Sequence, residues 1–156
     1  MAGATSRTGE KDFYVYYHHS GGLLAVLEMP RVEEDFPEDP ALGILEALVR
    51  SDPTDYLYLR LLGDLYTKTG RIREGLRVDL ALTTLYPHDP GVFYNLACSW
   101  SLLGEREKAL AALEEAVRLG WRDARFARQD PDLENLRSDP RFRRLLELME
   151  GEPAGG

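Results

Sequence analysis

The chain has 156 residues, of which 44% are hydrophobic and 29% are charged, and its formal net charge is −8. This composition is typical of one globular domain and excludes a wholly disordered chain. The single cysteine excludes a disulfide framework and a cysteine-rich zinc site. Because an acidic surface repels phosphate backbones, we do not expect the protein to bind nucleic acid.

The start of the chain carries no targeting or membrane signal. Residues 1–10 are small and polar, and no apolar run follows them. No window of the sequence has the ~20 apolar residues that are needed to cross a bilayer. We therefore expect residues 1–11 to be disordered, the protein to make no membrane contact, and its location to be cytoplasmic.

Residues 12–38 form a segment of different character. Residues 12–29 join an aromatic and β-branched run, a Ser-Gly-Gly turn signal and an apolar run, which favours a β-hairpin over a pair of short helices. An isolated hairpin is marginal in water, so it must pack on the helices that follow, on a second copy or on a partner. The candidate contact residues are Phe13, Tyr14, Tyr16 and Tyr17. We interpret the acidic stretch from Glu33 to Asp39 as a solvated linker in preference to an acidic docking motif.

The first helix is expected over Asp39–Ser51. Asp39 is a good N-cap, and Pro40 suits the first helical turn. No matching helix is expected before it, because Pro30 and Pro37 interrupt the preceding segment.

The most informative feature is an internal similarity. Residues 56–89 and residues 90–123 coincide at key positions when the two segments are aligned from their first residues. The coinciding pairs include Leu59 with Phe93, Leu62 with Leu96, Gly63 with Ala97, Tyr66 with Trp100, Gly70 with Gly104, and Gly75 with Ala109. Leu59, Leu62 and Tyr66 lie three and four residues apart, on one face of a helix. The small residues predict close helix contacts, and Gly70 and Gly104 predict left-handed helix ends.

This pattern, with its period of about 34 residues, resembles the tetratricopeptide repeat family over residues 56–123. The resemblance implies a mainly all-α fold, a short α-solenoid of antiparallel helix pairs. Residues 39–123 then contain a half repeat and two whole repeats, at 39–55, 56–89 and 90–123.

The chain is expected to close with a helical cap at residues 124–150 and a disordered tail at 151–156. Asp130-Pro131 and Asp139-Pro140 are two helix-start signals. When the alignment is continued by one more repeat length, Asp130 and Pro131 fall at the leucine and small positions, so we expect no third regular repeat. The cap covers the last repeat and turns its arginines to solvent.

No catalytic or metal-binding constellation is evident. His18 and His19 are adjacent, and His88 sits in a turn, so none has metal-ligand spacing. Cys98 has no base assigned beside it, the carboxylates form no recognisable acid–base pair, and no glycine-rich phosphate loop occurs. We therefore expect a protein that is not an enzyme and that needs no metal or cofactor.

The resemblance implies a peptide-binding groove along the first helix of each repeat. The implied lining residues are Arg60, Asp64, Thr67, Tyr94, Asn95, Cys98, Ser101 and Arg125. In this family, basic and asparagine side chains clamp a peptide's C-terminal carboxylate, but here Asp64 stands where an asparagine is expected and Gln129 where a basic residue is expected. Asp64 would repel such a ligand by about 1–4 kcal/mol at close contact. We therefore expect the groove to bind a mixed-charge or internal peptide, or the protein's own N-terminal arm. The alternative is that Arg60 and Asp64 simply form an ion pair with each other.

The sequence thus predicts a non-enzymatic protein–protein interaction module, an adaptor or chaperone-like scaffold that binds a peptide or a partner helix in its groove. The alternative is a structural subunit or homodimer that assembles through the aromatic N-terminal segment.

Overall fold

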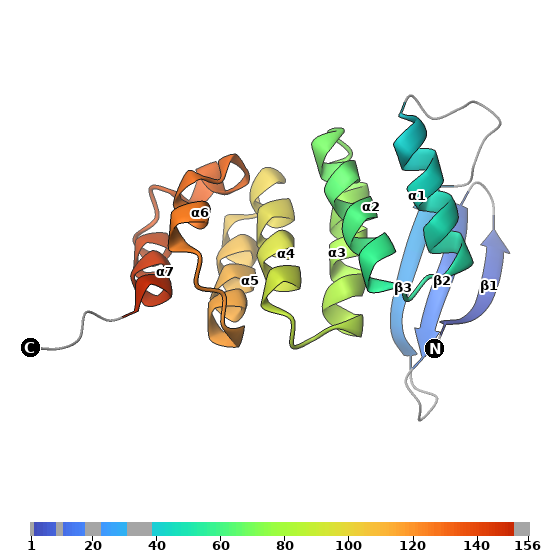
Figure 1. Ribbon diagram of the computed structural model, residues 1–156, viewed down its shortest axis with the longest axis horizontal. Helices are drawn as coiled ribbons and strands as arrows, with labels where there is room; N and C mark the ends of the chain where they lie inside the picture. Colours follow the sequence, from blue (N-terminus) through green and yellow to red (C-terminus); the bar gives the residue numbers. More distant parts are fainter. Residues whose placement is uncertain (1, 9–10, 18–22, 31–38, 152–156) are drawn as a thin grey trace, which may run out of the picture. The chain divides into compact units, whose positions relative to one another are not determined.

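The computed structural model describes the backbone of residues 2–8, 11–17, 23–30 and 39–151, and the side chains of Leu27 and of residues 39–151. The chain divides into two compact units, residues 1–87 and 88–156, and each unit is described by itself. Figure 1 shows the elements in chain order.

The first unit opens with three antiparallel strands in the order β1-β2-β3. They are β1 (Ala2–Thr8), β2 (Lys11–Tyr17) and β3 (Leu23–Pro30). β2 and β3 pair from Lys11 opposite Pro30 to Tyr17 opposite Leu23. The expectation that residues 1–11 are disordered is wrong for Ala2–Thr8, which pairs with β2. This segment has little strand propensity of its own, and its pairing satisfies backbone groups along the open edge of β2.

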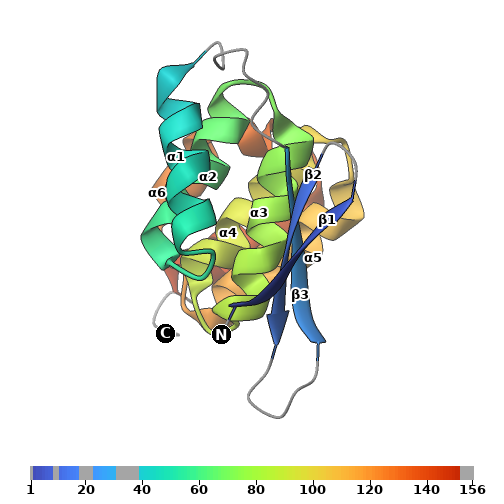
Figure 2. The same cartoon turned by 90° about the vertical axis from the view of Figure 1, so that its right-hand side faces the viewer.

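The strands and the first helix cover different parts of one helix pair. β3 packs against α3 (Ile72–Leu85), whereas α1 (Pro40–Ser51) packs against α2 (Tyr56–Lys68). Figure 2 shows the strands alongside α3 and α1 alongside α2. Leu27 of β3 is completely buried, so the sheet contributes to the core of this unit.

The predicted helix at Asp39–Ser51 is confirmed. The Asp39 carboxylate accepts a hydrogen bond of 2.9 Å from the Ala41 N–H, which caps α1. A buried bond ties α1 to α2, because the Tyr66 hydroxyl donates to Glu46 at 2.6 Å. Burial of Glu46 is tolerated because this donor replaces water.

The helix bounds repeat along the chain with a constant offset. Moving α2 (Tyr56–Lys68) and α3 (Ile72–Leu85) forward by one repeat length reproduces both bounds of α4 (Pro90–Leu102) and α5 (Arg106–Leu119). The turns between these helices repeat as well, since Gly70 and Gly104 have φ of 81° and 77°, as the sequence predicts. Both values lie in the left-handed region that favours glycine.

Helices lie over the expected cap at residues 124–150, and their bounds keep the repeat length, which the sequence analysis did not predict. A second step of the same length places helices over 124–136 and from 140 onward, where α6 (Ala124–Gln129), the 3₁₀ helix η1 (Pro131–Leu136) and α7 (Pro140–Glu150) lie. Pro131 has no N–H and Asp130 caps the segment that follows, so the first helix of this third pair is broken in two. The capping aspartates Asp55, Asp89 and Asp123 carry the same spacing and could have revealed this pair in the sequence.

Small residues allow α2 and α3 to approach closely. A Cβ atom at Gly63 would lie 3.3 Å from Cγ1 of Val78, and one at Gly75 would lie 2.8 Å from Oγ1 of Thr67. Leu59, Leu62 and Leu82 are completely buried around this contact. The chain is mainly helical, as expected, and none of the helices in the described part of the chain is long and apolar enough to traverse a bilayer.

This close contact predicts the outcome of a single methyl insertion. Gly75→Ala gains about 1 kcal/mol of helix propensity but forces Thr67 aside, at a cost of about 1–3 kcal/mol. We therefore expect a net loss of stability, measured by urea unfolding. The double variant Gly75→Ala/Thr67→Ala should recover part of the lost stability. If the stability losses of the two single variants simply add, residues 67 and 75 are not in contact.

Candidate interaction surfaces

On α2, the predicted groove residues do not form one surface. Asp64 is exposed and pairs with Lys68 at 2.6 Å, so the alternative pairing of Arg60 with Asp64 is wrong. The guanidinium of Arg60 lies 5.8 Å from the ring centre of Tyr56, and its Nη1 is buried with no hydrogen-bond partner among the described residues. Thr67 was expected to line the groove, but its hydroxyl donates to the Gly63 carbonyl at 3.1 Å and faces Gly75 of α3.

Two large leucines are exposed on α2. Leu57 and Leu61 expose 57% and 44% of their surface. They lie four residues apart, on one side of the helix, and Asp64 and Lys68 continue the same row. The signal in the sequence is the i, i+4 spacing of apolar residues outside the buried face of Leu59, Leu62 and Tyr66.

On α4, the groove prediction is wrong for three residues. Tyr94, Cys98 and Ser101 expose 2%, 6% and 0% of their surface. They are covered because η1 packs on α4, and the Asn135 amide donates to the Ser101 carbonyl at 2.7 Å. The predicted open surface on this helix is therefore occupied by the chain's own C-terminal segment.

The remaining two predicted groove residues are less buried than these three. Asn95 is half-buried on α4, and Arg125 is exposed on α6. The Tyr94 and Trp121 rings stack with centres 4.2 Å apart, and Phe126 lies beside both with 52% of its surface exposed.

A polar cluster holds the broken helix against α4. The Asp130 carboxylate accepts a bond of 2.8 Å from the Tyr94 hydroxyl and one of 3.0 Å from the Asp132 N–H, while the Cys98 thiol lies 3.8 Å away. Ligand atoms of Cys98, Asp130 and Asp132 lie within 4.8 Å of one another, which sequence reasoning missed. Both oxygens of Asp130 already accept hydrogen bonds, so we assign this cluster to packing rather than to a metal ion.

The N-terminal contact prediction falls outside the described side chains. The backbone of β2 is described, but the side chains of Phe13, Tyr14, Tyr16 and Tyr17 are not. His18, His19, the acidic residues 33–38 and the tail 152–156 also lie outside the described residues. His88 is exposed in the turn before α4.

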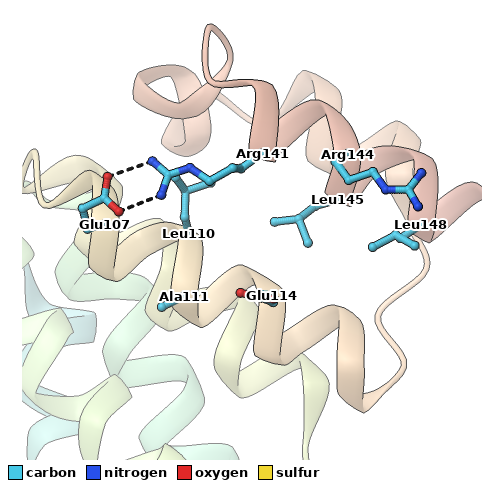
Figure 3. Close-up of a pocket in the computed structure, with 8 residues that line it drawn as sticks. All are labelled: Glu107, Leu110, Ala111, Glu114, Arg141, Arg144, Leu145 and Leu148. Atoms are coloured by element: carbon cyan, nitrogen blue, oxygen red, sulfur yellow. Dashed lines mark hydrogen bonds and ion pairs between the residues drawn. The ribbon is translucent and has the colours of Figure 1, made fainter.

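A groove between α5 and α7 is the second candidate surface. It has a volume of about 420 Å³, and we call it the α5–α7 groove. Its lining residues are Glu107, Leu110, Ala111, Glu114, Arg141, Arg144, Leu145 and Leu148. Figure 3 shows the first four on α5 and the last four facing them from α7.

An ion-pair network closes one end of the α5–α7 groove. Arg141 donates two hydrogen bonds to Glu107, at 2.7 and 2.8 Å (Figure 3). Its guanidinium donates two more to Asp139, at 2.8 and 3.0 Å. Hydrogen bonds from Arg141 lower the pKa of Glu107 and hold that of Asp139 at about 2. All three groups are therefore charged at neutral pH, and the bidentate geometry fixes the start of α7 against α5.

The fold and these surfaces define a helical repeat-like protein. No family model matches the sequence. The chain is similar to a chloroplastic protein from Arabidopsis thaliana, with 39% identity over 88 residues. The match covers 54% of this chain and 26% of that relative, so the chain spans about a quarter of the relative's length.

The buried tyrosines predict a loss of stability at alkaline pH. Burial, together with hydrogen bonds to Glu46 and Asp130, raises the pKa of Tyr66 and Tyr94 far above 10.0. Unfolded tyrosines ionise near pH 10, so above this pH the unfolded state binds fewer protons than the folded state and stability falls. In Tyr94→Phe the urea midpoint should fall less steeply above pH 10 than in the parent protein. An equally steep fall in both proteins would show that Tyr94 does not cause the alkaline loss of stability.

Proposed function

We propose that this chain is a non-enzymatic protein-interaction module of the tetratricopeptide type, serving as an adaptor or chaperone-like scaffold. The constant offset of the helix bounds, one repeat length from each pair to the next, supports the repeat assignment. The contacts at Gly63 and Gly75 support it as well, because small residues stand where the helices of such a pair approach closely.

The observation that carries the proposal is the exposed row on α2. Leu57 and Leu61 are adjacent large apolar side chains with about half of their surface in water. Exposed apolar clusters rimmed by charged residues are typical of protein-binding sites, and Asp64 with Lys68 supplies such a rim. We propose that a partner polypeptide covers these two leucines.

The C-terminal segment of the chain supports the idea that a helix face of this kind holds polypeptide. The face of α4 that η1 covers corresponds to Arg60, Asp64 and Thr67 of α2, which lie beside the leucine row. On α4, η1 buries Leu133 and Leu136 and is anchored by polar bonds from Tyr94 to Asp130 and from Asn135 to Ser101. This combination of apolar contacts and a few polar anchors is what protein–peptide interfaces use. On α2, we propose that Arg60 and Asp64 serve as the polar anchors.

The compartment and the partner stay predictions. The name of the Arabidopsis relative describes a chloroplastic protein, and the match covers only part of both chains. A cytoplasmic location of this chain therefore remains the sequence-based expectation.

The leucine row can be tested with a matched control. Leu57→Gln/Leu61→Gln should abolish co-purification of partners that the parent protein captures from its native extract, as identified by mass spectrometry. Leu80→Gln changes a leucine on α3 of similar exposure, 41%, and should leave capture intact. The α2 row is not the site if the double variant captures the same partners, or if Leu80→Gln loses them equally.

The second candidate function is a homodimer or structural subunit assembled through the N-terminal sheet. We propose it because, among the described strands, β1 has a neighbour on one side only, and the backbone groups on its other side can pair with a further strand.

Light scattering on the full chain across a range of concentrations tests this candidate. A dimer mass supports it if the variant Ser6→Pro shifts that mass toward the monomer. Proline at this position of β1 removes a backbone hydrogen-bond donor. A monomer mass at every concentration removes the dimer.

A further inference from the structure

The α5–α7 groove arises because α7 departs from the repeat in its rotation. Moving the apolar face of α5 forward by one repeat length leads from Leu110 and Leu113 to Arg144 and Glu147, which are both exposed. The residues that α7 buries are Phe142, Leu145, Leu146 and Met149. This rotation leaves Arg144 and Leu148 on the side of α7 that faces α5 across the groove, as Figure 3 shows.

The floor of the α5–α7 groove is apolar and only partly covered. Leu110 and Leu145 are nearly buried, at 4% and 7% exposure, whereas Ala111 is exposed and Leu148 retains 37% exposure. From Glu107 to Glu114 the lining covers two turns of α5, a length of roughly 10 Å. An elongated apolar groove of two helical turns matches the i, i+3, i+4 contacts of a docked helix.

The charges around the α5–α7 groove leave one carboxylate without a basic partner. Arg141 is neutralised by Glu107 and Asp139, and Arg144 pairs with Glu147 at 3.2 Å. Among the glutamates of residues 39–151, Glu114 alone forms no ion pair. The paired ones are Glu46, Glu74, Glu105, Glu107, Glu115, Glu134, Glu147 and Glu150.

We propose that the α5–α7 groove docks a basic amphipathic helix of a partner protein. Apolar side chains of that helix enter between Leu110, Leu145 and Leu148, and a lysine or arginine one turn away pairs with Glu114. The closed Glu107–Arg141 end fixes how far the helix extends along the groove. This surface is separate from the α2 row and does not depend on it.

The test uses a capped helical peptide of leucine, alanine and lysine, titrated into the isotopically labelled full-length protein and followed by nuclear magnetic resonance. A peptide of the same composition in scrambled order, and one with glutamate in place of lysine, serve as ligand controls. We expect the largest amide shifts at residues 107–114 and 141–148, and weaker binding of both control peptides.

Two variants at exposed positions of the α5–α7 groove test whether the peptide binds there. Glu114→Lys should weaken binding roughly tenfold, because it replaces an attraction by a repulsion, and Ala111→Arg should block the groove. Glu134→Lys makes the same charge change on η1, and Ala41→Arg makes the same size change on α1; both should bind as the parent does.

Several results would overturn the proposal. These are unchanged affinity in Glu114→Lys, equal affinity for the glutamate peptide, or shifts confined to α2. Concentration-dependent shifts at the groove without peptide, with a dimer mass in sedimentation, would assign the groove to a second copy instead. Loss of binding in Leu57→Gln/Leu61→Gln would tie the peptide to the α2 row rather than to the groove.

Discussion

The close approach of α2 and α3 is the constraint on which the first unit depends. Gly75 leaves no room for a further carbon, since an added Cβ would lie 2.8 Å from the Thr67 hydroxyl, and Gly63 leaves little, since an added Cβ would lie 3.2 Å from the Asp79 carboxylate. The corresponding positions in the second unit hold Ala97 and Ala109, both completely buried. Small residues at these points let two helices bury their leucines against each other, which is the main source of stability in each pair.

One backbone pattern carries two different surfaces. Leu57 and Leu61 of α2 remain exposed, whereas η1 packs on α4, where Tyr94, Cys98 and Ser101 are buried. The closure depends on Asp130, which caps a new helical segment and at the same time accepts the Tyr94 hydroxyl. The broken third pair thus ends the repeat and covers the face that a continued repeat or a ligand would otherwise contact.

The α5–α7 groove of the second unit likewise arises from an irregularity in the repeat. Because α7 turns a different face toward α5, Arg141 meets Glu107 at one end while a partly open apolar groove remains along the rest. Ion pairs at such exposed positions contribute little to stability, but they orient α7 and so shape the groove. An imperfect repeat can therefore supply binding surfaces that a perfect one would bury.

The sequence alone determined the helices of residues 39–123 and the helix starts after them, because their signals are local, whereas β1 forms only by pairing with β2. Asp39, Asp130 and Asp139 start helices, and Gly70 and Gly104 end them, through contacts within a few residues. Which helix faces stay open was decided only by the tertiary structure. Tyr94 and Cys98 are buried by a segment more than thirty residues further along the chain, and Glu114 lines a groove whose other side is α7. Helix caps depend on neighbours in the chain, whereas exposure depends on which distant segments pack together in space.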